Sequence, residues 1–463
     1  MKNHSLIAAL CLLVGFGSKV VADDIGHAVY RVEIMTPGGA LPFILYSENE
    51  GSIFGVKGTP SEYKSYWVIR NGEEQIRIRF PEDASQVEYF GPRLLNRRDR
   101  LARFTTRSRV TSSVPFEQYD SILEWTRWIG MGFLNHAPEQ NEGVWRKQRG
   151  EKVYELPVLV TDLGWYSSWD TYERFVPFPD DVGFDMDEPV NYTGRWKVKF
   201  DSSDEPAVAI FEVDDEQLAT GTFMTTTGDY RYLAGRVDGP YMRLSTFDGA
   251  HAFLFHAEMV ARNKITGDFW SGNWHHETWT AVRDDDATLP DAFEQTTITD
   301  ERALADAVFK DIDGTPTRVL DTLDATNAKA RVIEIFGTWC PNCADASREL
   351  VSLKEKYGDD LGIVGLAFEV TEDFERSSQQ VQRHHAHIGS DWEILIAGLS
   401  DKAKATETLG FLDKVRSYPT LIFLNADNEV QAVYSGFSGP ATGDAYTQQR
   451  ERFEALIERM INE

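Results

Sequence analysis

Two cysteines separated by two residues constrain this chain more than any other feature. Cys340 and Cys343 enclose Pro341 and Asn342, and the only other cysteine of the 463-residue sequence is Cys11. An isolated pair cannot complete a four-ligand zinc site, because the second pair of ligands is missing. Nor can it staple a large fold. It can open and close as a disulfide, so the sequence predicts a redox-active Cys340–Cys343 pair.

The start of the chain predicts the compartment in which that pair works. Residues 1–22 read as an export signal, with an early lysine, an apolar run over 6–16 and small side chains ahead of Asp23. The run is too short to span a membrane. Cys11 would be removed with the signal, and bulky Leu10 before it disfavours a lipid anchor. We therefore expect an exported, periplasmic or cell-envelope protein, soluble after cleavage, where disulfides persist.

The charge of the chain excludes some partners. A formal net charge of −27 disfavours nucleic acid and anionic membrane surfaces. The local exception is a stretch with seven arginines between Arg93 and Arg109. A solvated insertion explains this stretch better than a dock for an acidic partner.

Short β-branched and aromatic segments separated by turn residues fill residues 191–284. This spacing predicts an antiparallel meander of about eight strands, forming a barrel or a sandwich. Residues 23–180 resemble a diverged copy of this unit that carries the Arg-rich insertion, and the sequence leaves a duplication open. The strands expected in 191–284 are 195–200, 207–213, 218–225, 230–237, 241–247, 252–261, 267–270 and 277–283.

The pattern changes after a polar linker at 285–299. Over residues 300–463, strands alternate with helices, beginning with a buried strand at 330–336 that leads into the cysteines. The following helix places Ala346, Leu350, Leu353 and Tyr357 on one face. Parallel strands with crossover helices, closing on an antiparallel pair and a helix, predict an α/β domain of thioredoxin-like order. The further expected elements are strands at 363–368, 393–396, 420–424 and 430–434, and helices at 374–388, 400–409 and 445–461.

A family resemblance rests on two stretches of this domain. Residues 335–343, Ile-Phe-Gly-Thr-Trp-Cys-Pro-Asn-Cys, together with Tyr418-Pro419-Thr420, resemble the TlpA/ResA-like branch of exported thiol–disulfide oxidoreductases. The helix–strand–helix segment at 374–409 is similar to the insertion of that branch. Residues 227–232 and 245–249 are similar to N-terminal regions of some multidomain TlpA-like proteins, for which we know no function.

The resemblance implies an activity and its participants. It implies a thiol–disulfide oxidoreductase, with disulfide reduction as the favoured direction and no cofactor. The implied partners are proteins that contain a disulfide or a dithiol, with a membrane thiol donor as the electron source. It also implies that Pro419 is cis and that Tyr418-Pro419 lies against the cysteines, where exposed backbone could hold a partner's segment and exclude metals.

Simple chemistry assigns roles to the cysteines. Cys340 at a helix N-terminus would face unpaired N–H groups, which favour the thiolate needed for attack on a partner's disulfide. Cys343 would then resolve the mixed disulfide. Pro341 suits the first helical turn. Asn342 would influence the reduction potential, and Trp339 would either shield one side of the sulfur or simply pack.

Glu334 is the candidate proton acceptor. It lies six residues before Cys340 inside an apolar strand, close to where thioredoxins usually have an aspartate. Burial would raise its pKa and let it accept the proton of Cys343. The alternative is an ordinary half-exposed strand residue. TlpA-like proteins often have Glu and Pro where this chain has Ala346 and Arg348, which puts the usual tuning of Cys343 in doubt.

The sequence gives less support to other functions. A thiol peroxidase would need Pro and Thr where Ile333 and Gly337 stand. A binding protein would use the β units and carry a vestigial redox domain. His384, His385 and His387 lie near a helix end without an acid or thiol at ligand spacing, so we expect capping or solvated roles and no metal.

Overall fold

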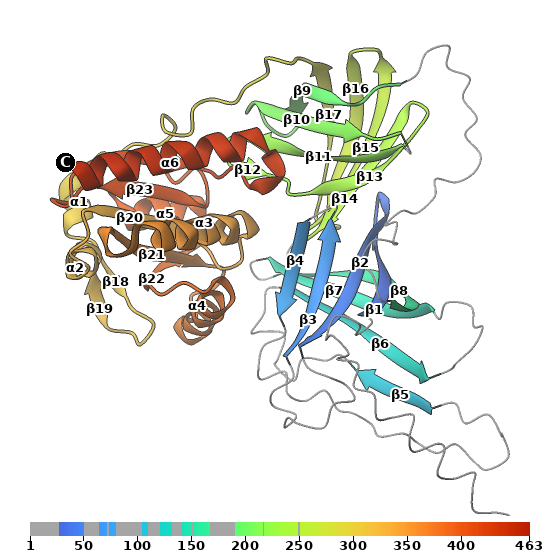
Figure 1. Ribbon diagram of the computed structural model, residues 1–463, viewed down its shortest axis with the longest axis horizontal. Helices are drawn as coiled ribbons and strands as arrows, with labels where there is room; N and C mark the ends of the chain where they lie inside the picture. The colour runs from blue at the N-terminus through green and yellow to red at the C-terminus, as the bar shows by residue number, and fades with distance from the viewer. Residues whose placement is uncertain are drawn as a thin grey trace, which may run out of the picture.

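The described residues form three β-sheets in the computed structural model (Figure 1). The structure describes residues 27–50, 64–71, 74–79, 104–109, 121–131, 140–149, 152–166 and 190–463, apart from 216 and 249–250. The expected signal at 1–22 lies outside these residues, as do the first five arginines of the Arg-rich stretch. Arg107 and Arg109 lie in a strand, β5. No helix in the described ranges has the length and apolar character needed to cross a membrane.

The first sheet is an eight-stranded antiparallel meander in the order β4-β3-β2-β1-β8-β7-β6-β5. Its first strand pairs with both the second and the last. Val32, Ile34, Phe43 and Trp145 are buried on one face. The strands are β1 (His27–Thr36), β2 (Gly39–Glu50), β3 (Lys64–Asn71), β4 (Glu74–Arg79), β5 (Phe104–Arg109), β6 (Ser121–Met131), β7 (Gln140–Arg149) and β8 (Lys152–Tyr166).

The second sheet is a closed barrel, because β10 pairs with both β9 and β11 and thereby completes a ring of eight strands. The barrel alternative of the sequence prediction is thus confirmed over the sandwich. The strands are β9 (Gly194–Phe200), β10 (Ala207–Val213), β11 (Leu218–Thr225), β12 (Gly228–Asp229), β13 (Leu233–Asp238), β14 (Tyr241–Phe247), β15 (Ala252–Ala261), β16 (Lys264–Ser271) and β17 (His275–Arg283).

Aromatic side chains fill this barrel. Trp196, Phe211, Phe223, Phe255 and Trp279 are at most 1% exposed. The rings of Phe223 and Phe255 stack with centroids 4.3 Å apart, and Trp279 meets Phe223 edge-on. Large aromatic groups bury 150–250 Å² each, so they account for much of the barrel's stability.

One predicted strand is wrong at its start. We expected a strand over 230–237 after a turn at Gly228 and Asp229, but β13 begins only at Leu233 and those two residues pair with β11 as β12. Arg231 has a φ of 63°, in the left-handed region that interrupts a strand. The side chains of Asp229 and Arg231 bond to residues of the α/β domain.

The two β units share one topological feature. In each, the first strand pairs with the last, β1 with β8 and β9 with β17. They differ elsewhere, because β4 and β5 lie at opposite edges of the first sheet, whereas the second sheet closes through β10 and β11. The two units pack together through apolar residues, including Phe43 stacked on Phe247 with centroids 4.6 Å apart.

The third sheet has the order β19-β18-β22-β21-β20-β23-β24 and forms the thioredoxin-like core. β20 is buried at every residue, pairs in parallel with β21 and antiparallel with β23. Its strands are β18 (Val308–Lys310), β19 (Pro316–Arg318), β20 (Ala330–Phe336), β21 (Leu361–Glu369), β22 (Glu393–Leu399), β23 (Thr420–Leu424) and β24 (Val430–Ser435).

Six helices accompany this sheet: α1 (Glu301–Ala305), α2 (Val319–Ala325), α3 (Pro341–Tyr357), α4 (Phe374–Ile388), α5 (Lys402–Leu409) and α6 (Asp444–Asn462). α3 packs against β21, α6 against β20, and α4 and α5 against β22. The two helices and two strands before β20 were not predicted. The residues expected to form a linker contact the α/β domain, as Ala292 accepts a hydrogen bond from the backbone of Ser435.

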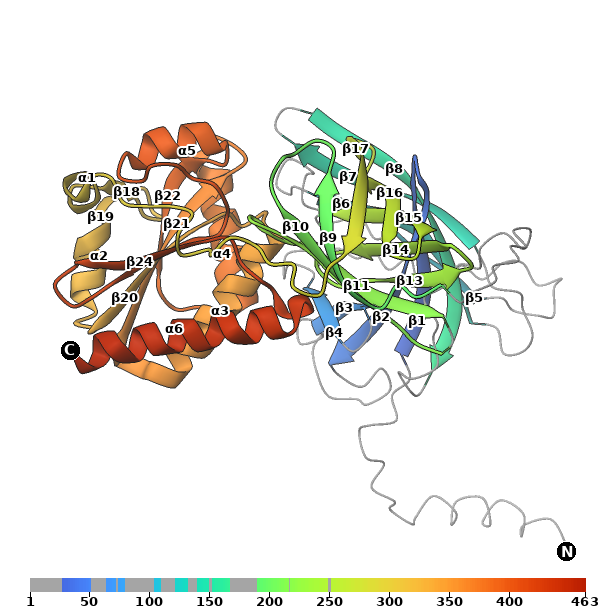
Figure 2. The ribbon, with the colours of Figure 1, turned by 90° about the horizontal axis from the view of Figure 1, so that it is seen from above.

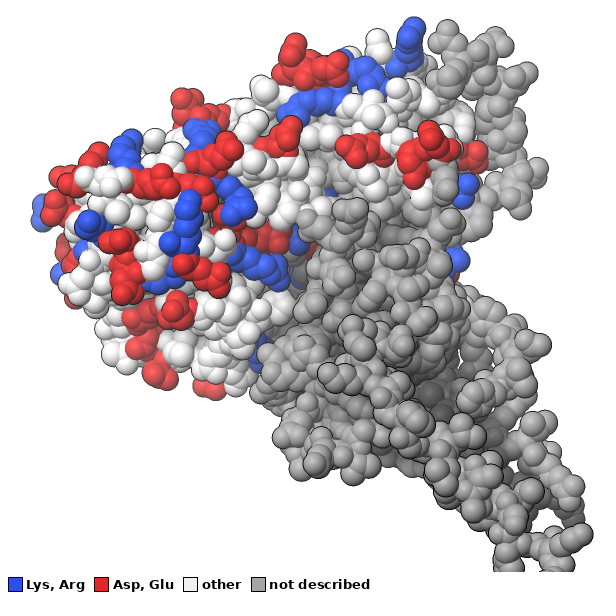
Figure 3. Space-filling view, in the orientation of Figure 1, with Lys and Arg blue, Asp and Glu red and all other residues white. Residues whose placement is uncertain are grey.

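The barrel and the α/β domain touch at two places. Figure 2 shows α6 running along the α/β domain toward the barrel. There Ala445 packs near Val208 and Met224 of the barrel. The second contact is made by residues 226–231, which we call the 226–231 loop. Acidic and basic side chains are interspersed over the face shown in Figure 3.

Candidate redox site

Cys340 caps the N-terminus of the helix that follows the central strand. It is the N-cap of α3, and its sulfur accepts a hydrogen bond of 3.3 Å from the backbone N–H of Cys343. Pro341 occupies the first turn of α3, where no N–H is needed. Both cysteines are free thiols, Cys340 7% exposed and Cys343 fully buried. A partner could therefore reach only Cys340.

Side chains before the cysteines fix the turn between β20 and α3. The buried carboxylate of Glu369 accepts hydrogen bonds from the backbone N–H and the hydroxyl of Thr338, at 2.9 and 2.7 Å. The indole N–H of Trp339 donates to the carbonyl of Phe368 at 2.9 Å. Trp339 also meets the ring of Tyr418 edge-on. Packing of Trp339 is thus observed, while shielding of the sulfur stays a prediction.

The Tyr418-Pro419 peptide bond is cis, as the family resemblance implied. The Cys340 thiol donates to the carbonyl of Tyr418 at 3.5 Å. The turn therefore lies beside the reactive sulfur, and its backbone could contact whatever chain approaches Cys340.

Glu334 is fully buried in β20, which rules out the half-exposed alternative. Burial raises its pKa to about 8, although a hydrogen bond from Ser347 opposes the shift. The Ser347 hydroxyl donates to Oε1 at 2.7 Å, and Oε2 has no hydrogen-bond partner among the described residues. Its role as a proton acceptor stays a prediction.

The environment of Cys343 favours the protonated form of its thiol. Burial raises the pKa of its thiol well above the usual value, and interactions with Cys340 and Glu334 raise it further. A buried thiol of this kind reacts only when a base removes its proton. Because the charge of Glu334 acts on Cys343, the carboxyl is close enough to influence it.

The histidines of α4 behave differently from one another, and one prediction was wrong. His384 is neither solvated nor a cap: it is 8% exposed, and its Nε2 lies 3.3 Å from the Ser347 hydroxyl. Burial lowers its pKa to about 3, so it is neutral at physiological pH. His385 does cap the helix end through Ser390, and His387 contacts Arg348.

The two departures from the TlpA-like pattern have different environments. Ala346 is fully buried in the core of the α/β domain. Arg348 forms an ion pair of 3.1 Å with Asp345 on the same helix. Neither supplies an acid beside Cys343, which leaves Glu334 as the carboxyl that acts on it.

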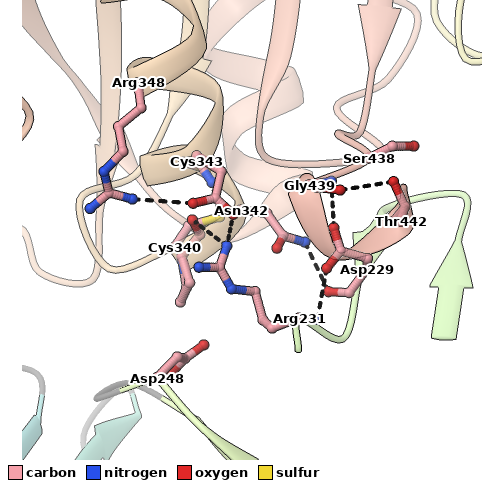
Figure 4. Close-up of polar contacts among 12 residues, drawn as sticks. Asp229, Arg231, Asp248, Cys340, Asn342, Cys343, Arg348, Ser438, Gly439 and Thr442 are labelled. Carbon is pink, nitrogen blue, oxygen red and sulfur yellow. Dashed lines mark hydrogen bonds and ion pairs between the residues drawn. The ribbon is translucent and has the colours of Figure 1, made fainter. Parts of the chain in front are cut away.

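Residues of the barrel reach the cysteine motif, which sequence reasoning missed (Figure 4). Arg231 forms a buried ion pair with Asp345 and donates to the carbonyl of Pro341 at 3.3 Å. The Asn342 amide donates to the carbonyl of Asp229 at 3.2 Å. Asn342 therefore binds the barrel besides flanking the thiols. The only sequence signal was the similarity of residues 227–232 to other multidomain proteins.

Asp229 is a barrel residue whose two carboxylate oxygens both accept hydrogen bonds. Its carboxylate accepts the backbone N–H of Arg231 at 2.7 Å and that of Gly439 at 2.6 Å. Burial raises the pKa of Asp229, while Arg231 and the backbone donors oppose the shift. The carboxylate thus connects the barrel to the loop that follows β24.

Comparisons with known proteins give a fold likeness only. No family model and no curated protein matches the chain. Similar solved structures include a secreted Mycobacterium tuberculosis disulfide oxidoreductase homologous to DsbE of E. coli (15% identity, TM-score 0.25), covering 35% of this chain and 99% of that one. A DsbF homologue from Corynebacterium diphtheriae (18%, TM-score 0.26) covers 35% and 93%. The exposed lipoprotein thioredoxin Etrx1 of Streptococcus pneumoniae (22%, TM-score 0.22) covers 32% and 99%. At these values we base no functional inference on the likeness.

Proposed function

We propose that the chain is an exported thiol–disulfide oxidoreductase of the TlpA/ResA-like type that reduces disulfides of partner proteins. The observation that carries the proposal is the N-cap position of Cys340, with the N–H of Cys343 directed at its sulfur. The adjacent cis turn and the buried carboxyl of Glu334 support it. Export and the direction of electron flow rest on the sequence alone.

The reaction has two exchange steps. The Cys340 thiolate attacks one sulfur of a partner's disulfide, so that a Cys340–partner bond forms and the second partner sulfur leaves as a thiolate. Cys343, after losing its proton, attacks the Cys340 sulfur and releases the first partner sulfur. Two electrons pass to the partner, and the Cys340–Cys343 disulfide remains. A membrane thiol donor would reverse these steps to restore the dithiol.

Glu334 is suited to both halves of this cycle. With a pKa of about 8, it is mostly protonated at neutral pH and ionises as the pH rises. The ionised carboxylate can take the proton of Cys343 before the resolving step. When the donor regenerates the dithiol, the protonated carboxyl can return a proton to the departing Cys343 thiolate.

Redox titration tests the proposal most directly. Equilibration of the protein with glutathione or dithiothreitol buffers should give one two-electron transition, within the range of about −270 to −120 mV known for such proteins. Cys340→Ser should abolish exchange with a protein disulfide, and Cys343→Ser should accumulate the mixed disulfide. A chain that fails to form the Cys340–Cys343 bond would overturn the proposal. Rapid consumption of peroxide would favour a thiol peroxidase instead.

A further inference from the structure

The 226–231 loop of the barrel binds both segments that flank the Cys340 sulfur. On the helix side, it bonds to Pro341, Asn342 and Asp345, as described above. On the side of the cis turn, the Ser417 hydroxyl donates to the carbonyl of Thr227 at 2.7 Å. Figure 4 shows the Arg231 side chain directed at the start of the cysteine helix, and the Asp229 carboxylate directed at Gly439. The loop therefore spans the rim of the reactive site.

The fit of this contact leaves no room for a side chain at two glycines. A Cβ at Gly228, whose φ is +146°, would lie 2.1 Å from the amide nitrogen of Asn342. A Cβ at Gly436 would lie 2.9 Å from the carbonyl oxygen of Thr226. Atoms so close would have to move apart. The barrel and the α/β domain thus approach each other closely at two points, one at a glycine of the barrel and one at a glycine of the α/β domain.

Arg231 supplies most of the electrostatic attraction at this contact. Its side chain and that of Asp345 are 8% and 10% exposed. Breaking a buried ion pair by removing one partner leaves an uncompensated charge, which is strongly destabilising. The residue also holds a left-handed φ, which an arginine adopts only where the surroundings fix it.

We propose that the 226–231 loop determines which disulfides reach Cys340. While the loop is docked, its backbone carbonyls accept hydrogen bonds from the Ser417 hydroxyl and the Asn342 amide, which lie on either side of the sulfur. A partner's backbone would otherwise bond to these two groups. Small disulfides still reach the 7% of Cys340 that is exposed. A folded protein surface reacts only when the loop leaves. This inference rests on the proposed function for its substrates, but the access it describes can be measured on the thiol alone.

Alkylation of the reduced protein tests access without any redox partner. Two reagents are compared: iodoacetamide, and a maleimide that carries a polyethylene glycol chain. In Arg231→Ala, the rate with the bulky reagent at Cys340 should rise at least about tenfold, because the docked state loses its ion pair. The rate with iodoacetamide should change less than about twofold. Cys343 stays unlabelled in all variants because it is buried.

Two further variants make the result specific. Gly228→Ala keeps every charge but forces a Cβ against Asn342, so it should raise the bulky-reagent rate as Arg231→Ala does. Arg262→Ala removes an exposed arginine in the turn between β15 and β16 and should match the wild type. Urea unfolding of each variant shows whether the barrel remains folded.

Substrate selectivity completes the test. Reduced wild-type protein should react faster with oxidised glutathione than with insulin, and Arg231→Ala should raise the insulin rate selectively. Equal bulky-reagent rates in the wild type, Arg231→Ala and Gly228→Ala would overturn the inference. If alkylation rates change but the wild type exchanges with no disulfide, the proposed function fails while the control of access stands.

Discussion

Two of the buried carboxyl groups near the cysteines can be compared: Asp229 from the barrel and Glu334 from the central strand. Burial raises the pKa of both. Asp229 receives two backbone N–H groups and faces Arg231, so both of its oxygens are bonded. Glu334 receives one hydroxyl, and its second oxygen has no hydrogen-bond partner in the described part of the chain.

This difference distinguishes a carboxyl group that joins parts of the fold from one that is available for proton transfer. Fully bonded buried acids join parts of a protein, because their desolvation is offset by hydrogen bonds. An acid left with an unpaired oxygen keeps its proton to higher pH and can exchange it during a reaction. Four experiments test whether the two carboxyl groups differ in this way.

The largest expected effect is on the pH dependence of stability. Because the folded pKa of Glu334, about 8, lies above the ordinary value of 4.5, its contribution is complete below pH 4.5 and is lost as the pH rises through 8. Between pH 5 and 9, the free energy of unfolding of the reduced wild type should fall relative to Glu334→Gln by on the order of 4 kcal/mol. Urea unfolding at both pH values measures this. Parallel curves for the two proteins would mean that Glu334 is not protonated in the fold.

Asp229→Asn should lose stability at pH 7. One of the two backbone donors would then face an amide N–H group, which leaves a buried donor unsatisfied and costs about 2 kcal/mol. Urea unfolding at pH 7 gives the value, with the exposed Asp215→Asn in the turn after β10 as the matched control. A loss no larger than that of the control would contradict a joining role for Asp229.

Glu334→Gln should also slow the resolving step by about tenfold at pH 8, which is less than the range of about 10²–10⁴-fold usual for general-base catalysis. The rate in the wild type should rise as the carboxyl ionises between pH 7 and 9, whereas the variant should lack that rise. Stopped-flow decay of a mixed disulfide between Cys340 and a coloured aromatic thiol measures it. An unchanged pH profile would assign proton removal to solvent.

The smallest effect is expected for Ser347→Ala. The hydroxyl of Ser347 lowers the pKa of Glu334, so its loss should raise that pKa further, by up to about one unit. The midpoint of the resolution profile should move upward accordingly. Ser352→Ala on the same helix is the control. If both variants share the wild-type midpoint, the hydrogen bond to Glu334 has no influence on its proton.

Sequence alone predicted what is local or periodic. The Cys340–Cys343 motif and the buried strand before it are each defined by a few neighbouring residues, whereas the cis bond at Pro419 was implied only by the family resemblance. The barrel followed from evenly spaced strands and turn residues. The three-residue strands β18 and β19 were missed because such short segments show no periodicity.

The rest depends on contacts between distant residues. Arg231 and Asp345 are 114 positions apart, and no local pattern indicates that they meet. His384 lies in a polar stretch of sequence, and only the packing of α4 against α3 buries it. Such residues are defined by tertiary structure, so sequence reasoning could name Glu334 but not its neighbours.

The pairing of first and last strands in each β unit has a consequence for how such a molecule can be assembled. Because β9 and β17 are adjacent, the chain starts and finishes the barrel at one point on its wall. A unit with neighbouring ends can be inserted or removed with only a short rejoining of the chain. The barrel can therefore be joined to other domains through two chain ends that leave its wall side by side.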